Sequence, residues 1–183
     1  MPYTVTPTEI PDVLILEPKI FRDARGFFLE SFNARDFALA TGKEQHFVQD
    51  NHSKSSENVL RGLHYQIKNP QGKLVRVTEG EIYDVVVDLR RSSKTFGKWV
   101  GVALSSTNMK QLWVPEGFAH GFVVTSAEAQ LLYKTTDYWS PDHERSLLWS
   151  DPSLGIKWPI KGKPILAKKD EEGRLFVDSE HFE

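Results

Sequence analysis

The stretch VLRGLHYQ, residues 59–66, is rich in residues that favour β-strands, and a glycine interrupts it. Side chains alternate between the two faces of a strand, so strict alternation puts His64 on one face and Arg61 on the other. Both could serve one site only if a bulge redirects a side chain, and Gly62 is where we expect such a bulge. A core histidine and a solvated arginine explain the stretch equally well on its own.

Further strand patterns extend as far as residue 138, separated by polar turns. In residues 81–89, Tyr83 and every second residue after it form an apolar face, while Asp84 lies on the opposite face. The other stretches with strand patterns are 13–16, 27–32, 73–77, 97–104, 110–114, 121–125 and 130–138. Short strands at roughly even spacing predict an all-β fold, a jelly-roll barrel.

Two regions differ from this pattern. Residues 33–43 are predicted to form a short helix, with Asn33 as its N-cap and Gly42 at its end. Prolines break the chain after Pro141, but that tail is too apolar to be disordered, so we expect it to pack back on the barrel. The sequence has no internal repeat or low-complexity linker, which predicts a single domain spanning residues 1–183.

Composition excludes several classes of function. The 23 basic and 25 acidic residues nearly balance, so no general attraction to nucleic acid or to an anionic membrane is expected. The sequence has no cysteine, which excludes disulfides, thiolate nucleophiles and cysteine-bound zinc. It also has no basic leader before a long apolar run and no apolar stretch of about 20 residues. We therefore expect a soluble cytoplasmic protein.

The inward side chains of a jelly roll converge on a cavity, which is its natural ligand site. The polar residues expected there are His64, Lys73, His120 and Tyr133. His120 ends a Pro-x-Gly-x-x-His pattern, residues 115–120, that is similar to one in cupin barrels. Buried histidines and tyrosines are most often hydrogen-bonded core residues. A lysine among inward valines, or Glu30 between two phenylalanines, instead needs a charged partner, a ligand or a wet pocket.

A metal site is the first alternative. A metal-binding cupin presents two histidines one residue apart, then a carboxylate and a later histidine. His64 has no second histidine at that spacing and no carboxylate soon after it, and the positive charge of Lys73 suits an oxyanion. We therefore expect neither a metal nor another cofactor.

Five stretches together resemble the dTDP-4-dehydrorhamnose 3,5-epimerase family of cupin-fold enzymes, and the likeness extends over about residues 10–170. They are Arg25–Glu30, Phe47–Asn51, Leu60–Gln66, Gly72–Arg76 and Trp113–Phe122. The resemblance implies proton abstraction at C3 and C5 of dTDP-4-dehydro-6-deoxyglucose and reprotonation from the opposite face. It assigns the base to His64, held by Asp170, the enolate-stabilising lysine to Lys73, and the acid to Tyr133. No cofactor is implied.

The resemblance also implies a set of substrate contacts. These would be Arg25, Glu30, Gln49, Asp50, Asn51, Arg61, His120, Glu144 and Lys169, with Tyr138 stacking on thymine. Enzymes that this chain resembles are homodimers with exchanged N-terminal strands, so a partner subunit could supply some of the contacts. The matches at Glu144, Lys169 and Asp170 rest on spacing rather than on a motif.

Two other functions remain open at this point. A mono-epimerase or a ketoisomerase acting on a related nucleotide sugar would share most of these residues. A cupin that only binds a nucleotide sugar is the alternative outside enzymes, although binding alone would not require an acid and a base on opposite sides of the ligand.

Overall fold

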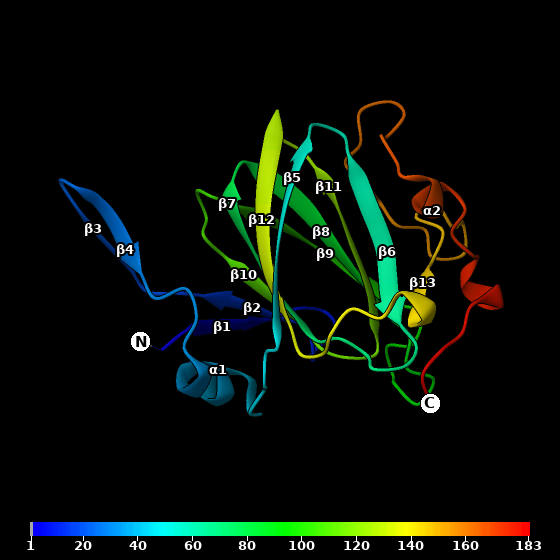
Figure 1. Cartoon of the computed structure of the whole chain (residues 1–183), viewed down its shortest axis with the longest axis horizontal. Coiled ribbons are helices and arrows are strands. Elements are labelled where there is room, and N and C mark those ends of the chain that lie inside the picture. The colour runs from blue at the N-terminus through cyan, green and yellow to red at the C-terminus, as the bar shows by residue number, and fades with distance from the viewer. Residues whose placement is uncertain (1) are drawn as a thin grey trace.

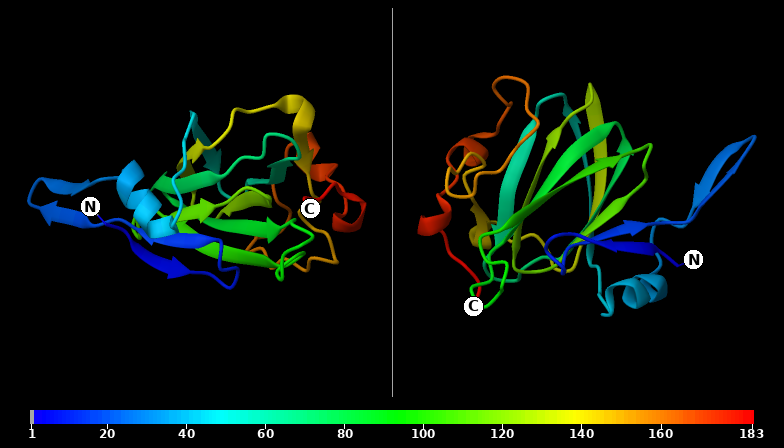
Figure 2. Two further views of the ribbon diagram at one scale, coloured as in Figure 1. Left: turned by 90° about the horizontal axis from the view of Figure 1, so that it is seen from below. Right: turned by 180° about the vertical axis from the view of Figure 1, so that it is seen from behind.

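The computed structural model describes residues 2–183, which form two large antiparallel sheets packed face to face and a separate two-stranded sheet (Figures 1 and 2). The six-stranded sheet has the order β1 (Thr4–Pro7), β2 (Leu14–Glu17), β10 (Gln111–Val114), β7 (Lys73–Glu79), β12 (Glu128–Thr135) and β5 (Gln49–Ser56). The five-stranded sheet has the order β13 (Glu144–Ser146), β6 (Leu60–Gln66), β11 (Phe118–Val124), β8 (Glu81–Asp88) and β9 (Trp99–Ser105). The fold is the predicted jelly-roll (cupin) barrel.

Strand β8 is buried on both faces, because two hydrophobic clusters lie on either side of its sheet. Ile82 and Val86 point between the sheets and pack with Val75 and Val77 of β7. The opposite face of β8 packs against Leu147 and other side chains of the C-terminal tail. This tail, yellow to red in Figures 1 and 2, covers the outer face of the five-stranded sheet, which confirms the expectation that it packs back on the barrel.

Strand β6 contains the bulge expected at Gly62. Arg61 pairs with Phe122 of β11 and His64 pairs with His120, so Gly62 and Leu63 of β6 lie opposite the single residue Gly121 of β11. Gly62 has a φ of +124°, which side-chain-bearing residues rarely adopt. The extra residue turns both Arg61 and His64 toward the space between the sheets, while Leu63 stays in the outer hydrophobic cluster.

The segment before β5 contains a helix and a projecting hairpin. Helix α1 (Ala34–Thr41) is capped by Asn33, whose side chain accepts from two backbone amides, and it ends at Gly42, as predicted. The hairpin of β3 (Ile20–Asp23) and β4 (Gly26–Leu29) extends away from the barrel (Figure 1). The strand expected over residues 27–32 is wrong in its second half, because β4 ends at Leu29. Glu30 therefore lies in the connection, where it accepts a hydrogen bond from Asn33.

The remaining elements are short. They are α2 (Lys168–Glu171) and the 3-10 helices η1 (Pro141–His143) and η2 (Phe176–Asp178). Within residues 2–183, no helix is long and apolar enough to span a membrane.

We expect Gly62→Ala to destabilise the fold by about 3 kcal/mol or more, because it combines an unfavourable φ with overpacking. A Cβ at Gly62 would lie 2.5 Å from the Cα of Gly121 in β11. Gly155→Ala is the matched control, since its φ is +61° but a Cβ there would meet nothing within 4 Å. The control should cost about 1 kcal/mol. Urea denaturation measures the free energy of unfolding of both variants. An equal decrease for the two would contradict the crowding of Gly62 against β11.

Candidate active site

A cavity of about 640 Å³ lies between the two sheets and collects most of the predicted site residues. Those that line it are His64, Lys73, Tyr133, Asp170, Gln49, Asn51, Arg61, His120, Glu144 and Lys169. Four other predicted residues, Arg25, Glu30, Asp50 and Tyr138, are absent from its lining. The cavity is of a size that holds a small ligand.

His64 and Asp170 form a hydrogen-bonded pair although 106 residues separate them. The Nε2 of His64 lies 2.6 Å from Oδ1 of Asp170. Asp170 is 1% exposed and belongs to the short helix α2, which the C-terminal tail brings to the end of β6. A buried carboxylate in this position orients the imidazole ring, as a general base requires.

Lys73 is buried at the start of β7, next to the inward-facing Val75. Burial lowers the pKa of Lys73 from 10.5 to about 8, and the nearby carboxylates of Asp84 and Glu144 oppose that change. The Nζ atom lies 3.4 Å from the backbone oxygen of His64. A buried cation with no ion pair among the described residues is well suited to stabilise negative charge that develops on a ligand.

Tyr133 lies on β12, so it reaches the cavity from the sheet opposite to that of His64. Burial raises the pKa of its phenol. The hydroxyl therefore stays protonated near neutral pH and can donate a proton. A base and an acid on opposite walls of a cavity that also contains a cation can remove a proton from one side of a ligand and return one from the other.

A second histidine–aspartate pair lies beside the first. His120 is the cross-strand neighbour of His64, and its Nε2 lies 2.9 and 3.0 Å from the two carboxylate oxygens of Asp84. Asp84 is fully buried on β8. Asp84 was not predicted as a site residue, although its alternation with Ile82 and Val86 placed it on the face that proves to be inward. A carboxylate on the same face of the strand as Ile82 and Val86 was the feature of the sequence that could have identified Asp84.

Strand β5 gives the cavity a polar wall. Gln49 and Asn51 line the cavity, and Ser53, which was not predicted, lines it as well. Asn51 Nδ2 and Ser53 Oγ are buried atoms that make no hydrogen bond within residues 2–183, so both can bind a ligand. Asp50 alternates with Gln49 and Asn51 along β5, so its side chain lies on the opposite face of the strand. There it forms an ion pair with Lys134 at 2.9 Å. The structure therefore separates Asp50 from the other predicted residues of this strand.

Charged groups at the cavity are mostly held by protein partners. Arg61 donates from Nε to the Oγ of Ser55 at 3.0 Å, which fixes its guanidinium beside the cavity. Lys169 lies 3.1 Å from Glu144, and both line the cavity near Asp170. Arg61 is thus positioned to bind an anionic ligand, and the Glu144–Lys169 pair offers both an acceptor and a donor.

Of the adjacent aromatic residues Tyr138 and Trp139, it is Trp139 that lines the cavity, whereas the expected residue was Tyr138. Trp139 lines the cavity and is 57% exposed, whereas Tyr138 is 64% exposed and outside the lining. Strand β12 ends at Thr135, three residues earlier than the predicted strand, and the chain then turns along the cavity rim. Two adjacent aromatic residues were visible in the sequence, but strand alternation does not continue beyond the end of β12 and could not choose between them.

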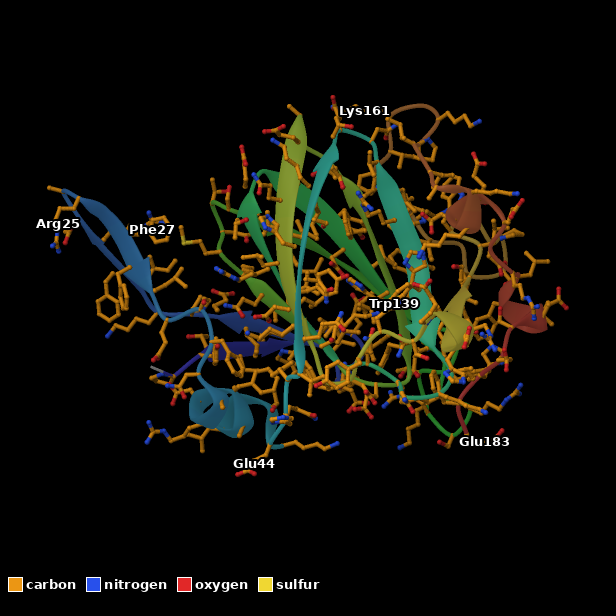
Figure 3. All side chains as sticks on the ribbon, viewed as in Figure 1. Arg25, Phe27, Glu44, Trp139, Lys161 and Glu183 are labelled. Carbon is orange, nitrogen blue, oxygen red and sulfur yellow. The ribbon has the colours of Figure 1, made fainter. Side chains whose placement is uncertain are left out.

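Arg25 and Glu30 lie in or beside the projecting hairpin. Arg25 is at its tip, where it forms an ion pair with Asp23, and Figure 3 shows it far from the barrel and from Trp139. The hairpin also exposes Phe27 and Phe28, at 57% and 65%. In the single subunit, the structure does not bring Arg25 or Glu30 to the cavity.

No group of three or more histidine, aspartate or glutamate side chains within residues 2–183 is arranged to hold a metal ion. His64 and His120, each paired with an aspartate, line a cavity that also contains Lys73. The donor set therefore favours an anionic ligand over a cation.

Comparison with known proteins identifies the family. The model of the dTDP-4-dehydrorhamnose 3,5-epimerase family matches residues 7–178. The chain belongs to this family. A dTDP-4-dehydrorhamnose 3,5-epimerase from Pseudomonas aeruginosa is 58% identical over 173 residues, which are 94% of this chain and 96% of the relative. Enzymes of this family are isomerases.

Solved structures of epimerases agree with the fold. A dTDP-6-deoxy-D-glucose-3,5-epimerase from Legionella pneumophila, in complex with dTDP-4-keto-L-rhamnose, superposes with a TM-score of 0.95 at 49% identity, covering 97% of this chain and 95% of that one. A 3'-monoepimerase from Streptomyces bikiniensis, in complex with dTDP-quinovose, superposes with a TM-score of 0.88 at 32% identity. The match covers 93% of this chain and 87% of that one. The family fold thus accommodates epimerases that act at different numbers of carbons.

We expect Lys73 to titrate near pH 8, measured from its Cε chemical shift in 13C-labelled protein and assigned with Lys73→Arg. Asp84→Asn should move this pKa further down, because the Asp84 carboxylate raises it. The folded pKa lies below the unfolded value, so the buried charge destabilises the fold below pH 8. That penalty disappears as the pH rises from about 8 to 10.5. A lysine that titrates near 10.5 would contradict the burial of its ammonium group.

Proposed function

We propose that this cavity inverts C3 and C5 of dTDP-4-dehydro-6-deoxyglucose, giving dTDP-4-dehydro-L-rhamnose in the biosynthesis of dTDP-L-rhamnose. The observation that carries the proposal is the convergence of His64, Lys73 and Tyr133 on one cavity from opposite sheets. Membership of the epimerase family supports the choice of substrate.

The chemistry explains why these three side chains are needed together. C3 and C5 both lie next to the C4 ketone, so loss of a proton from either carbon gives a carbanion that is stabilised as an enolate. His64, oriented by Asp170, removes the proton. The ammonium of Lys73 stabilises the negative charge that develops on the C4 oxygen. Tyr133 then donates a proton to the same carbon from the opposite face, which inverts its configuration.

Binding of the nucleotide diphosphate follows from the rim of the cavity. Arg61 would bind the diphosphate, because a guanidinium forms charge-assisted hydrogen bonds with phosphate oxygens. Trp139 would stack on thymine, in place of Tyr138, because Trp139 lines the cavity. Gln49, Asn51, His120, Glu144 and Lys169 are the remaining proposed contacts within the subunit. Asp50 could contribute only indirectly, since it faces away.

The competing functions differ in where solvent hydrogen enters the sugar. Incubation with dTDP-4-dehydro-6-deoxyglucose in deuterated water should label both C3 and C5. Label at one carbon would indicate a mono-epimerase, and movement of the ketone would indicate a ketoisomerase. Absence of label would indicate a cupin that only binds the nucleotide sugar.

Two variants should separate the base from the acid. His64→Ala should abolish solvent exchange at C3 and C5, because no enolate can form without the base. Tyr133→Phe should retain some exchange with unchanged configuration, because the enolate can be reprotonated from the His64 side, while inverted product falls by about 100-fold or more. Deuterium at each carbon is followed by NMR together with product stereochemistry.

Circular dichroism serves as the control, and both variants should remain folded because each removes polar atoms from a solvated cavity. The assignment of base and acid would be wrong if Tyr133→Phe stopped exchange completely while His64→Ala left it intact.

We further propose a homodimer in which each N-terminal hairpin reaches the cavity of the partner subunit. The hairpin of β3 and β4 projects from the barrel (Figure 1). It exposes Phe21, Phe27 and Phe28, which a single subunit leaves in solvent. Its tip carries Arg25, a predicted substrate contact that cannot reach the cavity of its own subunit in this arrangement. In a two-fold dimer the two exchanges are equivalent, so both sites would be completed.

Complementation tests this exchange. Arg25→Ala and His64→Ala chains that are unfolded and refolded together should recover activity, although each variant alone has little. The mixed dimer then contains one site with both native residues, so about a quarter of wild-type activity should return for random pairing. Each variant refolded alone is the control. If Arg25 acts within its own subunit, no mixed dimer has a native site and mixing should restore nothing.

A further inference from the structure

The segment Asp137–Ser140, here called the rim segment, lies outside the sheets but its backbone is held by glutamine side chains. Gln49 accepts from the backbone N–H of Trp139 at 3.1 Å. Gln66 donates to the backbone oxygen of Tyr138 at 3.2 Å and accepts from the N–H of Ser140 at 2.8 Å. Gln71 donates to the oxygen of Asp137 at 2.9 Å. These side chains supply the bonds that a neighbouring strand would otherwise provide.

Gln66 is the central member of this set. It is 4% exposed, lies two residues beyond His64 on β6, and lines the same cavity. Its second amide hydrogen bonds the backbone oxygen of Asn69 at 2.8 Å, so both donors and the acceptor oxygen of the side chain are used. Only a neutral amide of this length supplies two donors and one acceptor at these positions.

The bonds fix the backbone on both sides of Trp139. The oxygen of Tyr138 and the N–H of Trp139 belong to one peptide group, which Gln66 and Gln49 hold from its two ends. The N–H of Ser140 belongs to the next peptide group, which Gln66 also holds. The direction of the Trp139 side chain follows from the orientation of these two groups. Trp139, which lies outside the sheets, is thereby fixed at the cavity.

We propose that Gln66 is a positioning residue that sets the affinity for the nucleotide by fixing Trp139, and that it takes no part in proton transfer. The inference rests on the proposed function for the identity of the ligand. Gln66 makes no hydrogen bond to His64, Lys73 or Tyr133 in the described chain, so its removal leaves the proton-transfer groups in place. Preorganisation of the stacking surface lowers the cost of ordering it when the nucleotide binds.

Gln66→Met conserves volume and removes all three hydrogen bonds. We expect KM for the nucleotide sugar to rise about tenfold, with kcat within about twofold of wild type, since base stacking commonly contributes that much. Kd for dTDP, measured by calorimetry, should rise by the same factor. Trp139→Ala should give a similar increase. The double variant should be no weaker than the Trp139 variant alone, because Gln66 acts through Trp139.

Asn108→Ala is the matched control. The Asn108 side chain also makes three backbone hydrogen bonds, in a turn outside the cavity lining, to Ala103, Ser105 and Lys110. Loss of a structural amide alone should lower thermal stability without changing KM. If Gln66→Met does not fold, Gln66→Glu keeps the size and the acceptor but loses both donors, and the same rise in KM is expected.

The inference is wrong if kcat falls while KM and the dTDP Kd stay unchanged, if the effects of the Gln66 and Trp139 variants multiply, or if Asn108→Ala raises KM equally. The dTDP Kd also distinguishes the two proposals. A wild-type protein that binds dTDP but does not epimerise the sugar refutes the proposed function, while the comparison of variants still tests the role of Gln66.

Discussion

The bulge at Gly62 is the constraint on which the site depends. Without it, Arg61 and His64 would face opposite sides of β6, and Leu63 could not remain in the outer hydrophobic cluster while both polar residues faced the cavity. The close approach of Gly62 to Gly121 in β11 leaves no room for a side chain at this point. A local backbone irregularity therefore allows one strand to serve both a hydrophobic core and a polar cavity.

The cavity combines buried charges that would be costly if they stood alone. Lys73 has a strongly lowered pKa because it is desolvated, but Asp84 and Glu144 favour its charged form. Asp84 in turn contacts His120, and Glu144 contacts Lys169. The charges are thus distributed so that each carboxylate has a cationic or titratable neighbour, while the Lys73 ammonium keeps no close ion partner within the described residues. Its electrostatic field remains available to a ligand.

Much of this could be predicted from sequence because alternation and chain breaks are local properties. The apolar positions of residues 81–89 indicated a strand, the glycine in residues 59–66 indicated the bulge, and Asn33 indicated the helix start. The resemblance to a family then selected fourteen residues, and ten of them line one cavity. Alternation applied to β5 would also have separated Asp50 from its neighbours, and applied to β8 it would have selected Asp84.

What sequence could not supply depends on where strands end and on contacts between distant segments. Alternation loses its meaning once β12 ends at Thr135, so it cannot decide between Tyr138 and Trp139. That choice is made by glutamines from other parts of the chain, which bond the backbone of the rim segment. Such bonds use groups that every residue has, so no side-chain pattern in the rim segment itself reveals them. The position of a binding residue can therefore be fixed by side chains whose own sequence context gives no sign of it.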